Sequence, residues 1–118
     1  MELSGKWKIA EAELGGKKLP SSGFDKMVLE MDGNSYQLHE EKIIDSGLLQ
    51  AIPGSSPAAM TITSLFGPNQ GKTFYCIYQF EGNDLIICYN LGGDTLPESF
   101  RTVEQTLLYL VRYKRIDG

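Results

Sequence analysis

The chain has 118 residues, of which 42% are hydrophobic and 22% charged, and these values indicate one folded domain over residues 1–118. Eleven basic and fifteen acidic side chains give a net charge of -4. This balance excludes nucleic acid or an anionic membrane as the main partner, because both bind basic surfaces. No apolar run approaches the roughly 18 residues that a membrane-spanning helix needs.

Short β-rich runs alternate along the chain with turn signals such as Gly33-Asn34 and Gly82-Asn83. A loop with about one helical turn is expected over Lys17 to Asp25, and a longer loop over Asn90 to Glu104. We expect these two loops to guard the mouth of any interior site. The eight predicted strands are Gly5 to Leu14, Lys26 to Asp32, Ser35 to Glu40, Ile43 to Ile52, Ala58 to Leu65, Lys72 to Phe80, Leu85 to Tyr89 and Thr106 to Arg115.

Eight antiparallel strands joined in sequence order predict an all-β, up-and-down barrel. Closure of the sheet removes the exposed edges that an open arrangement of the same strands would leave. A barrel of eight strands is just wide enough either to pack its interior with side chains or to hold one small ligand. The sequence leaves both alternatives open.

Alternation with a period of two predicts the inner face of most strands, although the last strand is apolar on both faces and stays unassigned. The inward set combines flexible methionines with tyrosines, whose hydroxyls need partners inside a barrel. This mixture favours a ligand cavity over a packed core of Leu, Ile and Val. The residues predicted to line the cavity are Met27, Leu29, Tyr36, Leu38, Met60, Ile62, Phe74, Tyr78 and Tyr89.

The two cysteines lie on either side of the turn at Gly82-Asn83. If that turn has two residues, Cys76 is opposite Tyr89 and Cys88 is opposite Ile77, so the two sulfurs face opposite sides of the sheet. This register predicts free thiols, which suit a cytosolic protein. A loop of three residues would instead bring the sulfurs together.

No catalytic or metal-binding pattern stands out. The segment Gly67 to Thr73 resembles a phosphate-binding loop, but it has one residue too few between its glycines and leads into a strand rather than a helix. His39, the only histidine, is expected on the outer surface beside Glu40 and Glu41. It therefore reaches neither a zinc site nor Cys76, whose thiol would be inert in an apolar interior.

Four groups of residues form a joint pattern along the chain: Gly5-Lys-Trp7, Gly67 to Thr73 with Ile77 and Tyr78, Gly82 to Leu85 with Ile87 to Tyr89, and Phe100 to Thr102. In this pattern the chain resembles a bacterial family of lipocalin-like domains, the planctomycete-type paralogous family, almost from end to end. The resemblance implies a lipocalin-type barrel whose base is closed by Trp7, with Arg115 or Arg112 of the last strand packed on it. Members of this family have no established activity to carry over.

We therefore expect a protein that binds a small apolar or amphipathic molecule inside the barrel, without catalysis, metal or cofactor. The alternative is a filled barrel that acts through its outer surface as a protein-interaction or inhibitor module. The first residues contain no apolar signal-peptide core. A cytoplasmic location is expected, and export is the alternative if a signal preceded this chain.

Overall fold

The computed structural model describes residues 3–116, which form nine strands and one short 3-10 helix. Residues 1, 2, 117 and 118 of the predicted domain lie outside the described residues. The elements are β1 (Gly5–Leu14), β2 (Lys17–Lys18), η1 (Ser21–Gly23), β3 (Val28–Asp32), β4 (Ser35–Glu40), β5 (Lys42–Ile52), β6 (Ala58–Phe66), β7 (Thr73–Glu81), β8 (Asp84–Asn90) and β9 (Leu108–Ile116).

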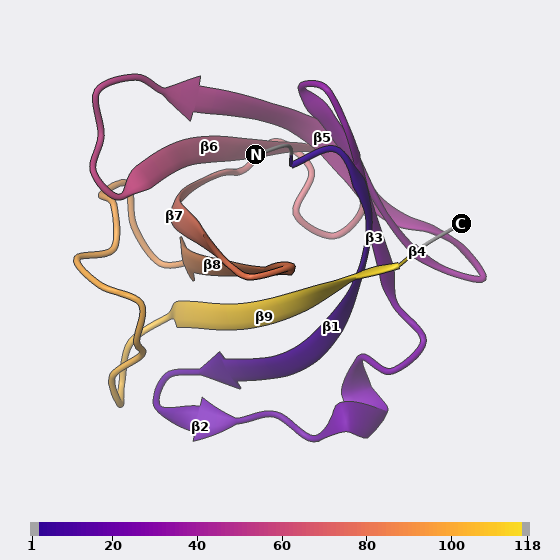
Figure 1. Cartoon of the computed structure of the whole chain (residues 1–118), viewed down its shortest axis with the longest axis horizontal. Coiled ribbons are helices and arrows are strands. Elements are labelled where there is room, and N and C mark those ends of the chain that lie inside the picture. Colours follow the sequence, from indigo (N-terminus) through magenta and orange to yellow (C-terminus); the bar gives the residue numbers. More distant parts are fainter. Residues whose placement is uncertain (1–2, 117–118) are drawn as a thin grey trace.

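Strands β1 and β3 to β9 pair antiparallel in sequence order, and β1 also pairs with β9. This last pairing closes the sheet into an eight-stranded barrel, with the two-residue β2 as a short addition beside β1 (Figure 1). The prediction of an all-β, up-and-down barrel is therefore confirmed. Helix η1 supplies the helical turn that was expected after the first strand.

The predicted hairpin turns fix the pairing of neighbouring strands. Around Gly33-Asn34, Asp32 is opposite Ser35, and around Gly82-Asn83, Glu81 is opposite Asp84. Both turns therefore have two residues, as predicted. Glycine is suited to them because Gly33 and Gly82 have positive φ angles of 61° and 59°.

Shifts in strand pairing let the sheet bend around its interior. In β1 a shift lies between Ile9 and Glu11, so that Ile9 before it and Ala12 after it both join the interior. In β5 another shift precedes Gly47, which lies very close to β6. A Cβ atom at Gly47 would collide with the carbonyl oxygen of Thr63, so only glycine fits there without movement of the backbone.

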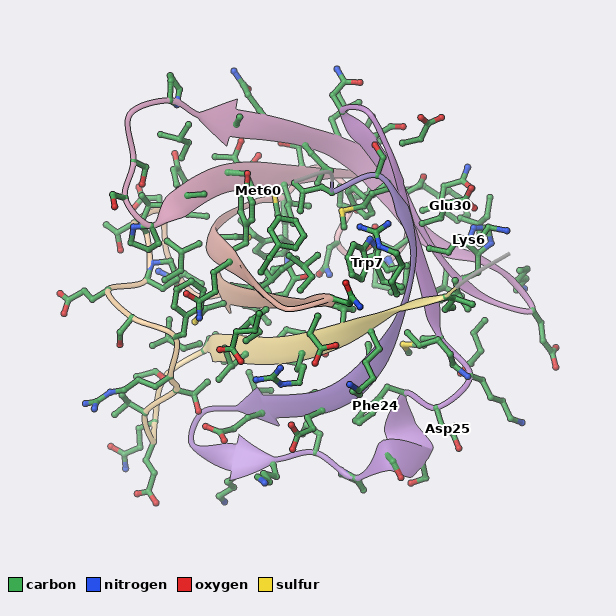
Figure 2. The ribbon with its side chains drawn as sticks, viewed as in Figure 1. Lys6, Trp7, Phe24, Asp25, Glu30 and Met60 are labelled. Carbon is green, nitrogen blue, oxygen red and sulfur yellow. The ribbon has the colours of Figure 1, made fainter. Side chains whose placement is uncertain are left out.

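The inward faces assigned from alternation are confirmed, because every assigned residue belongs to the interior cluster or packs against it. Figure 2 shows Trp7 and Met60 pointing into the barrel, whereas Lys6 and Glu30 lie on its outside. The structure also assigns the last strand, whose inward residues are Tyr109, Val111 and Tyr113. The interior of the barrel is therefore rich in aromatic rings.

A second apolar layer lies outside the barrel, where the segment between β8 and β9 folds back over β6, β7 and β8. Its side chains Leu96 and Phe100 pack against a buried patch formed by Ala59, Ile77 and Cys88. The hydroxyl of Thr102 ties this segment to the end of β1, since it donates to the Glu13 carboxylate and accepts from the Gly16 backbone N–H at 2.7 Å. This cover explains why β8 is apolar on both faces.

Candidate functional site: a cavity inside the barrel

The barrel interior contains a cavity of about 210 Å³. Leu38, near the end of β4, Asn69, in the β6–β7 connection, and Leu91, just after β8, all line it. These three segments lie at the same end of the barrel, which we call the open end. Most of the wall is apolar or aromatic, as in typical sites for small molecules.

Seven of the nine residues predicted to line a cavity do line this one. They are Met27, Leu29, Tyr36, Leu38, Ile62, Phe74 and Tyr89. Sequence reasoning missed part of the wall, most of it on strands whose inward faces it left unassigned. The residues that the structure adds are Ile9, Met31, Asp45, Leu49, Asn69, Ile87, Leu91, Tyr109 and Tyr113.

The placement of Met60 and Tyr78 in the lining was wrong, although both residues point inward. Met60 is only 1% exposed and is packed into the core. The ring of Tyr78 packs edge-on against Phe80 at 6.4 Å between centroids, and Phe80 in turn lies 6.4 Å from Trp7. The rings of Phe80 and Tyr78 therefore extend from Trp7 at one end of the barrel, which we call the closed end.

Trp7 closes this end of the barrel and is completely buried. Its indole Nε1 donates to the carbonyl oxygen of Leu3 at 3.0 Å, and the Arg115 guanidinium lies over the ring at 4.1 Å from the centroid. Arg115 also donates to the Ser4 carbonyl oxygen at 3.0 Å. A guanidinium on an indole face contributes about 0.5–2 kcal/mol, depending on how far it is desolvated.

We expect Gly5→Ala to destabilise the fold by about 1–3 kcal/mol. Gly5 has a φ of 141°, which side-chain-bearing residues rarely adopt, and a Cβ atom there would collide with the Arg115 guanidinium. Urea unfolding monitored by circular dichroism measures the change. Gly54→Ala is the matched control, because Gly54 also has a positive φ, of 78°, but has open space around it. Equal losses from both substitutions would contradict a role for the Arg115 contact.

The alternative that Arg112 packs on Trp7 is wrong. Because Val111 and Tyr113 point inward, Arg112 between them points outward, where it lies 2.9 Å from both Asp84 and Glu81. Hydrogen bonds to these carboxylates raise the pKa of Arg112, and the hydrogen bond from Arg112 is the main cause that lowers the pKa of Asp84. Arg112 therefore joins strands on the outer surface of the barrel.

One carboxylate, Asp45 of β5, lies in the cavity wall. Its Oδ1 accepts hydrogen bonds from the Tyr36 hydroxyl at 3.1 Å and from the Ser64 hydroxyl at 2.7 Å. Burial, and after it the charge of Asp45, raises the pKa of Tyr36, so the Tyr36 hydroxyl stays protonated. Tyr36 and the fully buried Ser64 therefore both donate to Asp45. Sequence reasoning missed this site, although the period-two spacing of Asp45, Gly47 and Leu49 would have indicated a shared face.

A pair of tyrosine hydroxyls forms another polar feature of the wall. The Tyr89 and Tyr113 hydroxyl oxygens lie 2.6 Å apart, and the Tyr89 ring stacks against Tyr109 with centroids 5.5 Å apart. Burial raises the pKa of all three phenols, so they are neutral at physiological pH. One hydroxyl of the pair donates to the other, and all three tyrosines line the cavity.

The cysteine register is as predicted: Cys76 is opposite Tyr89, and Cys88 is opposite Ile77. Cys76 belongs to the interior cluster and Cys88 to the outer patch, and both are free, buried thiols. Burial raises the pKa of Cys88 to about 11 and raises that of Cys76 as well. Neither thiol is an activated nucleophile.

We expect neither thiol to be alkylated by iodoacetamide at pH 8 in the folded protein, whereas both react in concentrated urea. The thiolate is the reactive form, and a pKa of about 11 leaves roughly one Cys88 side chain in a thousand ionised at pH 8. Intact mass against time measures the modification, and Cys88→Ser isolates the reaction of Cys76. Rapid labelling of the folded protein at either position would contradict the burial of that thiol.

Two further features singled out in the sequence are His39 and the segment Gly67 to Thr73. Glu30 is on the outer surface, and His39 Nε2 lies 3.6 Å from its Oε1. The segment Gly67 to Thr73 joins β6 to β7 and precedes a strand, so it lacks the helix N-terminus of a phosphate-binding loop. His39 stays on the outside, whereas Asn69 of the segment Gly67 to Thr73 reaches the cavity wall.

The expected guarding loops contribute little to the cavity. In the segment Asn90 to Glu104, Leu91 is the residue after β8 that lines the cavity. The residues that follow it cover the outer patch instead. The segment Lys17 to Asp25 places Phe24 in the interior cluster without lining the cavity. Of the two loops, only Leu91 is among the described residues that line the cavity, and the guarding of its mouth stays a prediction.

Together, the fold and the site define a closed antiparallel barrel with an interior cavity of ligand size. Comparisons with protein-family models, with curated proteins and with solved structures found no match to this chain. The resemblance to lipocalin-like domains therefore stays a prediction. Within residues 3–116, no helix is long and apolar enough to cross a membrane. The same residues contain no group of three or more His, Cys, Asp or Glu side chains that could hold a metal ion.

Proposed function

We propose that this protein binds a small apolar or amphipathic molecule inside its barrel without transforming it. The cavity of about 210 Å³ carries the proposal. An apolar cavity of about 150 Å³ accommodates benzene, so this cavity suits a slightly larger molecule, such as a six-carbon chain with a polar head. Burial at about 0.8 kcal/mol per methylene gives such a chain about 5 kcal/mol, or an affinity between 0.1 and 1 mM as an order of magnitude.

The groups around the cavity support binding rather than catalysis. The Cys76 thiol is held protonated by burial, and His39 lies on the outer face of β4, so the two do not form a nucleophile and base. Asp45 engages the Tyr36 and Ser64 hydroxyls, and the raised pKa of Tyr36 keeps its hydroxyl a donor. These groups are suited to orienting a ligand.

Within this proposal we assign the barrel to the lipocalin type. The support is the combination of Gly5 and Trp7 at the start of β1 with Arg115 over the indole ring. That combination closes one end of the barrel, as the sequence resemblance implies, and the cavity lies toward the other end.

Titration with 1-hexanol tests the proposal, followed by methyl resonances in carbon–proton NMR spectra. We expect saturable shifts at Ile62, Leu49 and Met27, which line the cavity, and none at the exposed outer residues Leu48 and Leu65. Shifts confined to outer methyls, or none at millimolar hexanol, would contradict an accessible interior site. Native mass spectrometry before and after organic extraction then identifies any molecule that copurifies.

The alternative proposal is an interaction or inhibitor module that acts through its outer surface. Leu48, Leu65 and Phe66 of the neighbouring strands β5 and β6 favour it, because they are 46%, 53% and 52% exposed. Exposed apolar side chains that gather on one face are typical of contact surfaces. This alternative predicts that L48E/F66E removes a protein partner while hexanol binding is unchanged.

A further inference from the structure

We propose that the cavity selects molecules with a protonated amine head, which pairs with Asp45. This inference rests on the proposed function and names the chemical class of its ligand. Among the described residues that line the cavity, Asp45 is the only charged one, and the remaining wall is apolar, aromatic or uncharged. A carboxylate exposed to an apolar cavity lowers its free energy most by contact with a cation that also donates hydrogen bonds.

The hydrogen bonds around Asp45 leave one of its oxygens available. The Tyr36 and Ser64 hydroxyls both donate to Oδ1, and no hydrogen bond from residues 3–116 reaches Oδ2. Ser64 is fully buried, and its single hydroxyl proton goes to the charged and closer Oδ1 rather than to the Phe66 carbonyl oxygen at 3.2 Å, so the two donors hold the orientation of the carboxylate. Asp45 therefore presents a positioned acceptor to the cavity.

The charge of the head group decides which amphipaths fit. An ammonium group supplies both positive charge and donors, whereas an alcohol supplies one uncharged donor and a carboxylate is repelled. The apolar tail of the same molecule contacts the wall formed by Leu49, Ile62 and Phe74. The cavity therefore favours a primary amine with a short apolar tail over the matched alcohol or acid.

Three probes with the same six-carbon chain test this inference: hexylamine, 1-hexanol and hexanoate, each titrated at pH 7 and followed at the cavity methyls. Charged hydrogen bonds are about twice as strong as neutral ones, so we expect hexylamine to bind about tenfold more tightly than hexanol, with hexanoate weakest. In Asp45→Asn, which keeps the acceptor oxygen for Tyr36 and Ser64, the preference for hexylamine over hexanol should fall to within about twofold. Asp32→Asn is the matched control, since it removes the same charge from an exposed position in the β3–β4 hairpin and should leave the preference unchanged.

The outcomes separate this inference from the proposed function. If hexanol shifts the cavity methyls but binds as tightly as hexylamine, the amine preference is wrong and the interior site stands. If Asp32→Asn reduces the preference as much as Asp45→Asn, the effect comes from net charge, and the pairing with Asp45 is wrong. If no probe shifts the cavity methyls, both proposals fail. The comparison of the three probes in the unaltered protein decides the amine preference even if Asp45→Asn does not fold.

Discussion

Replacing Trp7 with alanine is expected to lower the free energy of unfolding by about 3–5 kcal/mol, which is the range for truncation of a buried tryptophan. The indole is completely buried, donates to Leu3 and packs beneath Arg115 and beside Phe80. Its removal would leave a large void at the closed end of the barrel. A loss of this size is a large fraction of the 5–15 kcal/mol that a typical domain has, at order of magnitude.

Urea unfolding followed by far-ultraviolet circular dichroism measures this loss, because Trp7 is the only tryptophan and its fluorescence disappears with the substitution. Phe66→Ala is the control: it also truncates a large aromatic side chain, but one that is 52% exposed, and should change stability by no more than about 0.5 kcal/mol. A Trp7→Ala protein within about 1 kcal/mol of the original would show that Trp7 does not hold the closed end together.

The second large effect concerns ligand binding. We expect Leu38→Trp to weaken hexanol binding by about tenfold to a hundredfold, because an indole ring at this partly buried position would occupy the cavity that Leu38 now lines. Leu48→Trp is the matched control. It makes the same change on the adjacent strand β5, at a side chain that is 46% exposed on the outer surface, and should leave affinity unchanged.

The NMR titration with hexanol reports both variants, and their circular dichroism spectra check that the barrel is retained. Equal loss of affinity in the two proteins would show that the probe does not bind inside the barrel. Unchanged affinity in Leu38→Trp would place the ligand elsewhere in the molecule.

The inner faces of five strands were predictable because local patterns decide them. Leu29, Tyr36, Ile62 and Phe74 each lie in a run where inward and outward residues alternate, and each belongs to the interior. The strand β8 is apolar on both faces, and its inward side followed from its hairpin pairing with β7. The hairpin registers were equally local, because two-residue turns fix which residues are opposite each other. These features depend on neighbours along the chain or across one turn.

Other features were not predictable from such local patterns. The sequence did not show which side of β9 points inward, because its outward residue Leu110 is also apolar. Leu110 packs against the outer patch, and Phe100, which precedes β9 in the chain, packs against the same patch. The choice of Arg115 over Arg112 as the partner of Trp7 depended on that same assignment. The inward side of β9 and the partner of Trp7 both depend on residues that folding brings together and that are not neighbours in the sequence.

By itself, the sequence determined the barrel, its strand order, its hairpin registers and most of its inward faces, because turn residues and period-two alternation are local properties. Only the tertiary structure decided how the interior is divided. The rings of Trp7, Phe80 and Tyr78 pack against one another at the closed end, and a cavity of about 210 Å³ is left among the side chains toward the open end. Packing across the barrel also placed Asp45 in that cavity beside Tyr36 and Ser64, which lie on its two neighbouring strands.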